Sequence, residues 1–195
     1  MYGVFLIHSS NNLISNCKIL CDKYVQNEFG FRISPGKNNN EIINCQIYNC
    51  DTGFDIQSSN NKMIGNIIRD CGLQCFWIYT NVESGYFAKN NTVSGNTLFE
   101  VGDKIGWGYG IWIHYSVENK IINNSISNKY CGLHVEVYSD DTVIKNNEIF
   151  NNRDIRNALQ KSFGYRKGYM LEMSGKIEEA ENLIGLIDNK LDGSD

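Results

Sequence analysis

Residues 110–126, GIWIHYSVENKIINNSI, contain the pattern that decides the fold of this chain. A glycine opens a short apolar run, a polar turn follows, and an asparagine-rich segment ends on an aliphatic residue. The pattern occurs six times between residues 1 and 152, at intervals of roughly 22 residues. A period of this length, with two strand-like runs and no helical spacing, predicts a solenoid whose stacked units bury their faces against one another.

Aligning the asparagine-rich segments reveals columns of equivalent residues. Stacked parallel strands lie about 4.8 Å apart, so an asparagine amide can donate to the amide carbonyl of the next coil. We therefore expect a buried asparagine ladder between two aliphatic columns, and we interpret the flanking Asn12, Asn61 and Asn91 as turn residues. The ladder column is Cys17, Cys45, Asn66, Asn96, Asn124 and Asn147. The aliphatic columns are Ile14, Ile42, Met63, Val93, Ile121 and Ile144, then Ile19, Ile47, Ile68, Leu98, Ile126 and Ile149.

The glycine-led strands and the N-x-I-x-N-N-x-I turns resemble known repeats. The strands are clearest at residues 53–56, 110–113 and 132–135. They resemble the right-handed parallel β-helix of the pectin-lyase-like kind, in particular the NosD-type repeat of bacterial and archaeal surface or periplasmic proteins. The resemblance implies an all-β fold, a right-handed parallel β-helix of about six coils over residues 1–152, and an extracellular or cell-surface location. Lyases, hydrolases, epimerases and non-catalytic proteins share this fold, so it does not fix an activity.

Composition narrows the classes of partner. The net charge is −4 and no basic stripe is present, which argues against nucleic acid. The apolar runs are too short for a membrane span. The first strand begins directly after Met1 without a capping segment, and an uncapped β-helix exposes strand edges. We therefore expect the chain to be a piece of a longer protein, whose missing N-terminal segment would cover the first coil.

The seven cysteines admit two interpretations. By repeat alignment Cys17 stacks on Cys45 and Cys50 on Cys71, and neighbouring coils are close enough for a disulfide bond. We favour reduced, buried thiols, because a free cysteine packs as a small apolar side chain.

Two columns of residues should point away from the core, since side chains alternate along a strand. The outward columns gather aromatic rings and two histidines on consecutive coils, beside a cycle that is longer than the others between Ile78 and Gly110. Rings that stack on sugar C–H faces, next to polar groups, predict a glycan-binding platform. In the alternative, the long loops fold over this face and the rings belong to the core. One column reads Phe5, Arg32, Asp55, Trp77, Trp112 and His134, the other Ile7, Ser34, Gln57, Tyr79, His114 and Glu136, and the long loops carry Tyr86, Phe87, Trp107 and Tyr109.

The leading hypothesis is a carbohydrate-binding or surface-structural β-helix module. Its expected glycan contacts are Asp55, Trp77, Trp107, Trp112 and Glu136.

The alternative hypothesis is a polysaccharide lyase or epimerase acting on uronic-acid-containing glycans. Proton abstraction beside a carboxylate needs a base and a stabilising cation. Tyr79, His114 and His134 are the candidate catalytic groups, with Arg32 as the cation.

The same face also carries candidate metal ligands. His114, His134 and Glu136 lie on neighbouring coils and offer ligand types suited to zinc, but the acidic cluster of a calcium site is missing. We assign no metal site and no cofactor.

Residues 153–195 break the pattern and carry charged helix formers. Their apolar spacing predicts a helical hairpin, and GYMLEMSGKIEEAENLI, residues 168–184, resembles one tetratricopeptide repeat. The hairpin is expected either to cap the last coil or to begin an array of such repeats.

Overall fold

The computed structural model describes residues 5–22, 28–101, 108–128, 131–136 and 138–150, and these residues form three parallel β-sheets. Sheet A contains β1 (Phe5–Ile7), β4 (Phe29–Ile33), β7 (Thr52–Ile56), β10 (Gln74–Tyr79), β13 (Tyr109–His114) and β16 (Cys131–Val135). Sheet B contains β2 (Leu13–Ser15), β5 (Glu41–Ile43), β8 (Lys62–Ile64), β11 (Thr92–Ser94), β14 (Lys120–Ile122) and β17 (Val143–Lys145). Sheet C contains β3 (Lys18–Leu20), β6 (Gln46–Tyr48), β9 (Ile67–Arg69), β12 (Thr97–Val101), β15 (Ser125–Asn128) and β18 (Glu148–Phe150).

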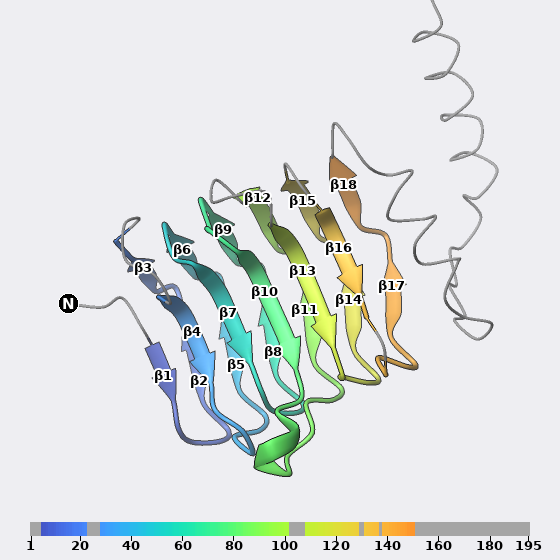
Figure 1. Cartoon of the computed structure of the whole chain (residues 1–195). Coiled ribbons are helices and arrows are strands. Elements are labelled where there is room, and N and C mark those ends of the chain that lie inside the picture. The colour runs from blue at the N-terminus through green and yellow to red at the C-terminus, as the bar shows by residue number, and fades with distance from the viewer. Residues whose placement is uncertain (1–4, 23–27, 102–107, 129–130, 137, 151–195) are drawn as a thin grey trace, which may run out of the picture.

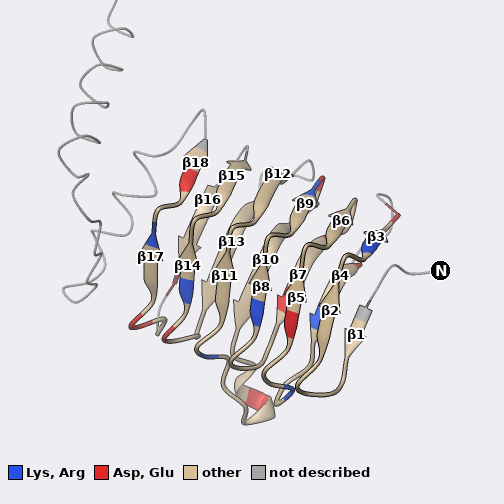
Figure 2. Ribbon diagram, turned by 180° about the vertical axis from the view of Figure 1, so that it is seen from behind, with Lys and Arg blue, Asp and Glu red and all other residues tan. Residues whose placement is uncertain are grey.

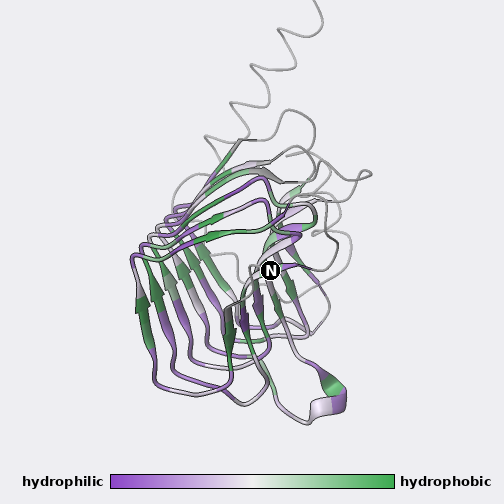
Figure 3. Ribbon diagram, turned by 90° about the vertical axis from the view of Figure 1, so that its left-hand side faces the viewer, coloured by the Kyte–Doolittle hydropathy of each residue, from purple (hydrophilic) through white to green (hydrophobic). Residues whose placement is uncertain are grey.

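Each coil gives one strand to each sheet, and every strand pairs in parallel with its equivalents on the adjacent coils. Successive coils superimpose when the molecule is viewed along its axis (Figure 3), and the strands run side by side in Figure 1. This arrangement confirms the predicted parallel β-helix. In the described part of the chain, no helix has the length and apolar character needed to cross a bilayer. The predicted helical hairpin, residues 153–195, lies outside the described residues.

The core is built from inward-facing columns, as the repeat predicts. The two aliphatic columns are paired residue by residue in sheets B and C, for example Val93 with Ile121 and Leu98 with Ile126. In sheet A the rings of Phe31, Phe54 and Phe76 stack with centroid separations of 5.2 and 4.6 Å. All three rings are fully buried.

The leading glycines of β4, β7, β13 and β16 also face inward. A Cβ atom on Gly53 would lie 2.6 Å from the backbone oxygen of Cys75 and 2.7 Å from the side chain of Ile68. The coil closes tightly at this point, which explains why glycine opens the repeat. Cys75, small and fully buried, takes the equivalent position in the next coil.

The predicted asparagine ladder is present between sheets B and C. Asn66 donates through Nδ2 to Asn96 Oδ1 (3.0 Å), Asn96 to Asn124 Oδ1 (2.9 Å), and Asn124 to Asn147 Oδ1 (2.9 Å). Each Oδ1 also accepts a backbone N–H from the preceding coil, as between Asn66 N and Asn96 Oδ1 at 2.8 Å. The ladder therefore satisfies both side chain and backbone in a dry interior.

A second ladder runs between sheets A and B, where the sequence interpretation placed only turn residues. Side-chain amide bonds join its first four members, as from Asn12 Nδ2 to Asn40 Oδ1 (2.7 Å) and from Asn61 Nδ2 to Asn91 Oδ1 (3.0 Å), and the fifth accepts the backbone N–H of Asn91 at 3.1 Å. The members are Asn12, Asn40, Asn61, Asn91 and Asn119. The last four of these residues are fully buried. The interpretation of Asn12, Asn61 and Asn91 as turn residues was wrong, because the left-handed turn residue is the neighbouring Asn11, Asn60 or Asn90.

One disulfide bond corrects the expectation of reduced thiols. Cys21 and Cys50 are bonded across adjacent coils with a Cα separation of 4.9 Å. Repeat alignment missed Cys21 as the partner of Cys50, because the pairing of Leu20 with Tyr48 places Cys21 opposite Asn49, one residue before Cys50. Cys45, Cys71 and Cys75 remain buried free thiols, and burial raises the pKa of the Cys45 and Cys75 thiols.

The first strand also corrects the predicted outward columns. Leu6, rather than Phe5, is paired with Arg32, and Ile7 is paired with the inward Ile33. Ile7 is buried, while Leu6 is half exposed. A one-residue slip exchanges the two faces of a strand, so the outward residues of this coil are Leu6 and His8.

Candidate functional site

The outer face of sheet A brings the predicted site residues into register on consecutive strands. Trp77 is paired with Asp55 on one side and Trp112 on the other, and Trp112 with His134. Arg32 is paired with Asp55, and Tyr79 with His114. The parallel pairing alone produces these columns, because equivalent residues of every coil stack at one strand spacing.

The rings on this face pack against one another, and we call them the aromatic face. The Trp77 ring stacks on Tyr79 with centroids 4.0 Å apart and on Trp112 at 5.5 Å. Trp112 stacks on His114 at 5.7 Å and is flanked by Tyr109 at 5.1 Å. The aromatic face consists of Trp77, Tyr79, Tyr109, Trp112, His114 and His134.

These rings are half-buried and are neither core residues nor fully solvated. The indole N–H groups of Trp77 and Trp112 are buried and meet no hydrogen-bond acceptor among the described residues. The two tryptophans therefore contribute apolar ring surface to the outer face. Among the described residues, the two histidines, Tyr79, Glu136 and Arg32 can supply polar contacts there.

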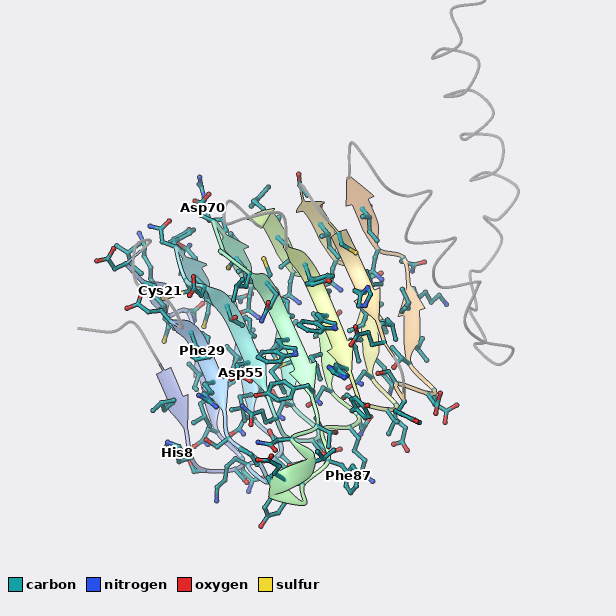
Figure 4. All side chains as sticks on the ribbon, viewed as in Figure 1. His8, Cys21, Phe29, Asp55, Asp70 and Phe87 are labelled. Carbon is teal, nitrogen blue, oxygen red and sulfur yellow. A yellow bond between two sulfur atoms is a disulfide. The ribbon has the colours of Figure 1, made fainter. Side chains whose placement is uncertain are left out.

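A buried carboxylate lies beside the aromatic face, in the middle of sheet A (Figure 4). Asp55 is fully buried, accepts hydrogen bonds from Gln57 Nε2 at 3.1 Å, and pairs with Arg32 Nε at 3.1 Å. Burial raises the pKa of Asp55 to about 6, although Gln57 and Arg32 both favour the charged form. Asp55 therefore holds Arg32 in place and presents no surface of its own, whereas the sequence hypothesis gave it a direct glycan contact.

Tyr79 is a weak candidate base in this environment. Burial, with the nearby Asp55 charge, raises the pKa of Tyr79 to about 12. Its phenol is accordingly protonated at neutral pH, where it can donate a hydrogen bond but holds no negative charge to accept a proton.

The two histidines share one carboxylate. Glu136 lies 3.4 Å from His114 Nδ1 and 3.2 Å from His134 Nε2, through its two different oxygens. About a third of each of these side chains is exposed. The three groups form a polar rim along one edge of the aromatic face.

The loop after β10 lies beyond the C-terminal ends of the sheet A strands. It contains the short 3-10 helix η1 (Val82–Ser84), which projects below sheet A in Figure 1. Tyr86 packs over Gly36 of a neighbouring turn, and Phe87, labelled in Figure 4, is 69% exposed. Trp107, the remaining predicted contact, lies outside the described residues.

The outer surface of sheet B differs in character. Figure 2 shows charged residues distributed over β5, β8, β14 and β17. Lys62 and Glu41 form an exposed ion pair there, with 2.7 Å between Nζ and Oε1. The mutually stacked rings thus lie on sheet A, where the sequence columns placed them.

Sequence reasoning missed three residues on this side of the molecule. His8 extends the outward column, and its Nδ1 lies 2.8 Å from Ser34 Oγ. It was missed because the predicted register of the first strand was wrong by one residue. Tyr115 contacts the His114 ring at 4.4 Å, and Tyr138 contacts Tyr115 at 5.1 Å. Both tyrosines occupy turns, where the side-chain alternation of strands does not hold.

Comparison with known families supports the repeat. Residues 1–108 match the family described as right handed beta helix region, and residues 78–167 match the family described as periplasmic copper-binding protein (NosD). No curated protein and no solved structure gives a significant match to this chain.

The copper named in the second family description can be tested against the side chains present. Copper prefers thiolate, thioether and imidazole ligands. Within the described ranges no group of three or more His, Cys, Asp or Glu side chains is arranged to hold a metal ion. His114 and His134 instead contact Glu136, so the described residues do not fit a copper centre.

Proposed function

This chain belongs to the right-handed β-helix family, and from that premise we propose that it is a surface-type β-helix module that binds a glycan on its aromatic face. The module is a rigid parallel stack, and its sheet A strands hold the contact residues at fixed spacings. Rigid strands suit this role, because side chains already in place lose little freedom on binding.

The observation that carries the proposal is the arrangement of half-buried rings across β10 and β13. Trp77, Tyr79 and Trp112 form one stacked group with centroid separations of 4.0 and 5.5 Å. Aromatic surfaces bordered by hydrogen-bonding groups match sugars, which alternate apolar C–H faces with hydroxyls. Arg32 lies toward one side and the His114–Glu136–His134 rim toward the other, so both borders of the rings are polar.

The same geometry favours binding over the lyase or epimerase alternative. Arg32 is paired with Asp55, and it stands three strands away from His114, about 14 Å at the usual strand spacing. A base and a cation that act on one uronate must meet at one sugar. The raised pKa of Tyr79 also works against its use as a base.

An extracytoplasmic location is part of the proposal. The Cys21–Cys50 disulfide is typical of oxidising compartments, and one matching family is described as periplasmic.

Trp112→Ala is expected to weaken glycan binding by about 1–3 kcal/mol, or roughly 5- to 150-fold in Kd, because it removes the central ring of the stacked group. The fold should persist, since Trp112 faces outward. The measurement is a titration by calorimetry with the hexasaccharides of cellulose, chitin, mannan and galacturonan.

Phe87→Ala is the matched control, because it removes an exposed ring from the loop after η1. Equal affinities of wild type and a folded Trp112→Ala variant would contradict the proposal. Release of unsaturated uronate from galacturonan, abolished by His114→Ala, would support the enzyme alternative instead.

A further inference from the structure

Two tyrosines on adjacent coils hold a backbone conformation that bulky residues rarely adopt. Tyr115 has a φ of +50° and Tyr138 a φ of +56°. The other non-glycine residues with positive φ in the described part of the chain are Asn, Asp and Glu118. Asparagine and aspartate tolerate this region because their short polar side chains bond locally, whereas a bulky residue there is an outlier.

The turns that carry these tyrosines are held from the inside. Ser116 and Ser139, the next residues, are fully buried and stack on each other, with Ser116 N 3.4 Å from Ser139 Oγ. Ser116 Oγ donates to the carbonyl of Ala88 at 2.7 Å and accepts from Asn119 Nδ2 at 2.9 Å. The serines anchor each turn, which leaves the preceding residue on the outside.

The tyrosine rings continue the aromatic face. His114 and Tyr115 are 4.4 Å apart between centroids, and Tyr115 and Tyr138 are 5.1 Å apart. A run of ring contacts therefore crosses three coils in the order Tyr79, Trp77, Trp112, His114, Tyr115 and Tyr138. The exposed fraction of the residues increases toward the end of this run, from 38% for Tyr115 to 59% for Tyr138.

We propose that Tyr115 and Tyr138 form a second glycan subsite, so that the aromatic face takes an extended oligosaccharide of several sugar units. This inference rests on the proposed function and adds to it the length and path of the glycan. Asparagine would fit both turns with less backbone strain, and tyrosine in its place supplies exposed ring surface at the end of the run. A short sugar would occupy Trp77 and Trp112 alone, and a longer one would also reach the tyrosines.

The test compares oligosaccharides of two lengths on one double variant. Tyr115→Asn with Tyr138→Asn replaces the tyrosines by the residue that the chain itself uses at left-handed positions. We expect the melting temperature to stay the same or increase, while the affinity for the hexasaccharide falls about tenfold and that for the disaccharide is unchanged. The probes are the di- and hexasaccharides of cellulose, chitin, mannan and galacturonan, and Tyr115→Phe with Tyr138→Phe is the ring-preserving control.

The outcomes separate this inference from the proposed function. If the hexasaccharide binds the Asn double variant as tightly as wild type while Trp112→Ala loses affinity, the second subsite is refuted and the proposed function stands. If no hexasaccharide binds the wild type, both are refuted. If the Phe variant loses as much affinity as the Asn variant, the rings are not the cause and the subsite is also refuted.

Discussion

Asn96→Leu is expected to lower the free energy of unfolding by about 3 kcal/mol or more, because several buried polar groups lose their partner at once. Asn96 Oδ1 accepts from the backbone N–H and the side chain of Asn66, at 2.8 and 3.0 Å. Its Nδ2 donates to Asn124 Oδ1 and to the carbonyl of Met63. Leucine fills the space but replaces none of these bonds, and water cannot reach the site.

Urea denaturation of the variant and of Asn147→Leu tests this expectation. Asn147 is the last ladder residue that the structure describes and is half-buried, so water can restore part of the hydrogen bonding that leucine removes there. The loss should therefore be clearly smaller for Asn147→Leu. Wild-type stability of Asn96→Leu would show that the amide ladder contributes little to the fold.

Asp55 is expected to make the protein less stable as the pH rises from about 4 to 7. Burial raises its pKa in the folded state from 3.8 to about 6. The unfolded chain therefore releases this proton at lower pH than the folded chain does, and stability falls across that interval by about 3 kcal/mol. Below the unfolded pKa both states hold the proton, and this contribution to stability is fully present.

The measurement is urea denaturation at several pH values for wild type, Asp55→Asn and the control Asp141→Asn. Asp141 is exposed and already adopts a left-handed conformation that suits asparagine. The wild type should lose stability relative to Asp55→Asn between pH 4 and 7, and Asp141→Asn should follow the wild type. Parallel pH curves for wild type and Asp55→Asn would refute a raised pKa.

The repeated features of the fold were predictable from sequence because each of them recurs in the sequence once per coil. The column from Asn66 to Asn147 and the aliphatic columns beside it recur at a fixed offset, and the structure confirms both. The outward column of Trp77, Trp112 and His134 followed from the same alignment.

Features that depend on a single coil were not predictable in this way. Strand β1 is Phe-Leu-Ile, and an all-apolar strand has no alternation to fix its register, so His8 was missed. The partner of Cys50 is one residue out of step with the repeat, since the strand register places Cys21 opposite Asn49. Asp55 is buried in contact with Gln57 and Arg32, and the aligned sequence repeats do not reveal these contacts.

The second ladder shows a further limit of sequence reasoning. Two adjacent asparagines look alike in sequence but have different roles in the structure. In the pair Asn90–Asn91, Asn90 adopts the left-handed conformation of the turn, and Asn91 is fully buried in the ladder. Only the direction of each side chain separates the two roles, and the turn geometry sets that direction.

Tryptophan fluorescence of the wild-type protein, titrated with the four hexasaccharides, tests the central claim most directly. Two of the three tryptophans of the chain, Trp77 and Trp112, lie in the aromatic face. A glycan stacked there should give a saturable change in emission with at least one hexasaccharide and should protect the indoles from acrylamide quenching. Unchanged emission and quenching with all four, from a protein that melts cooperatively, would contradict glycan binding at this face.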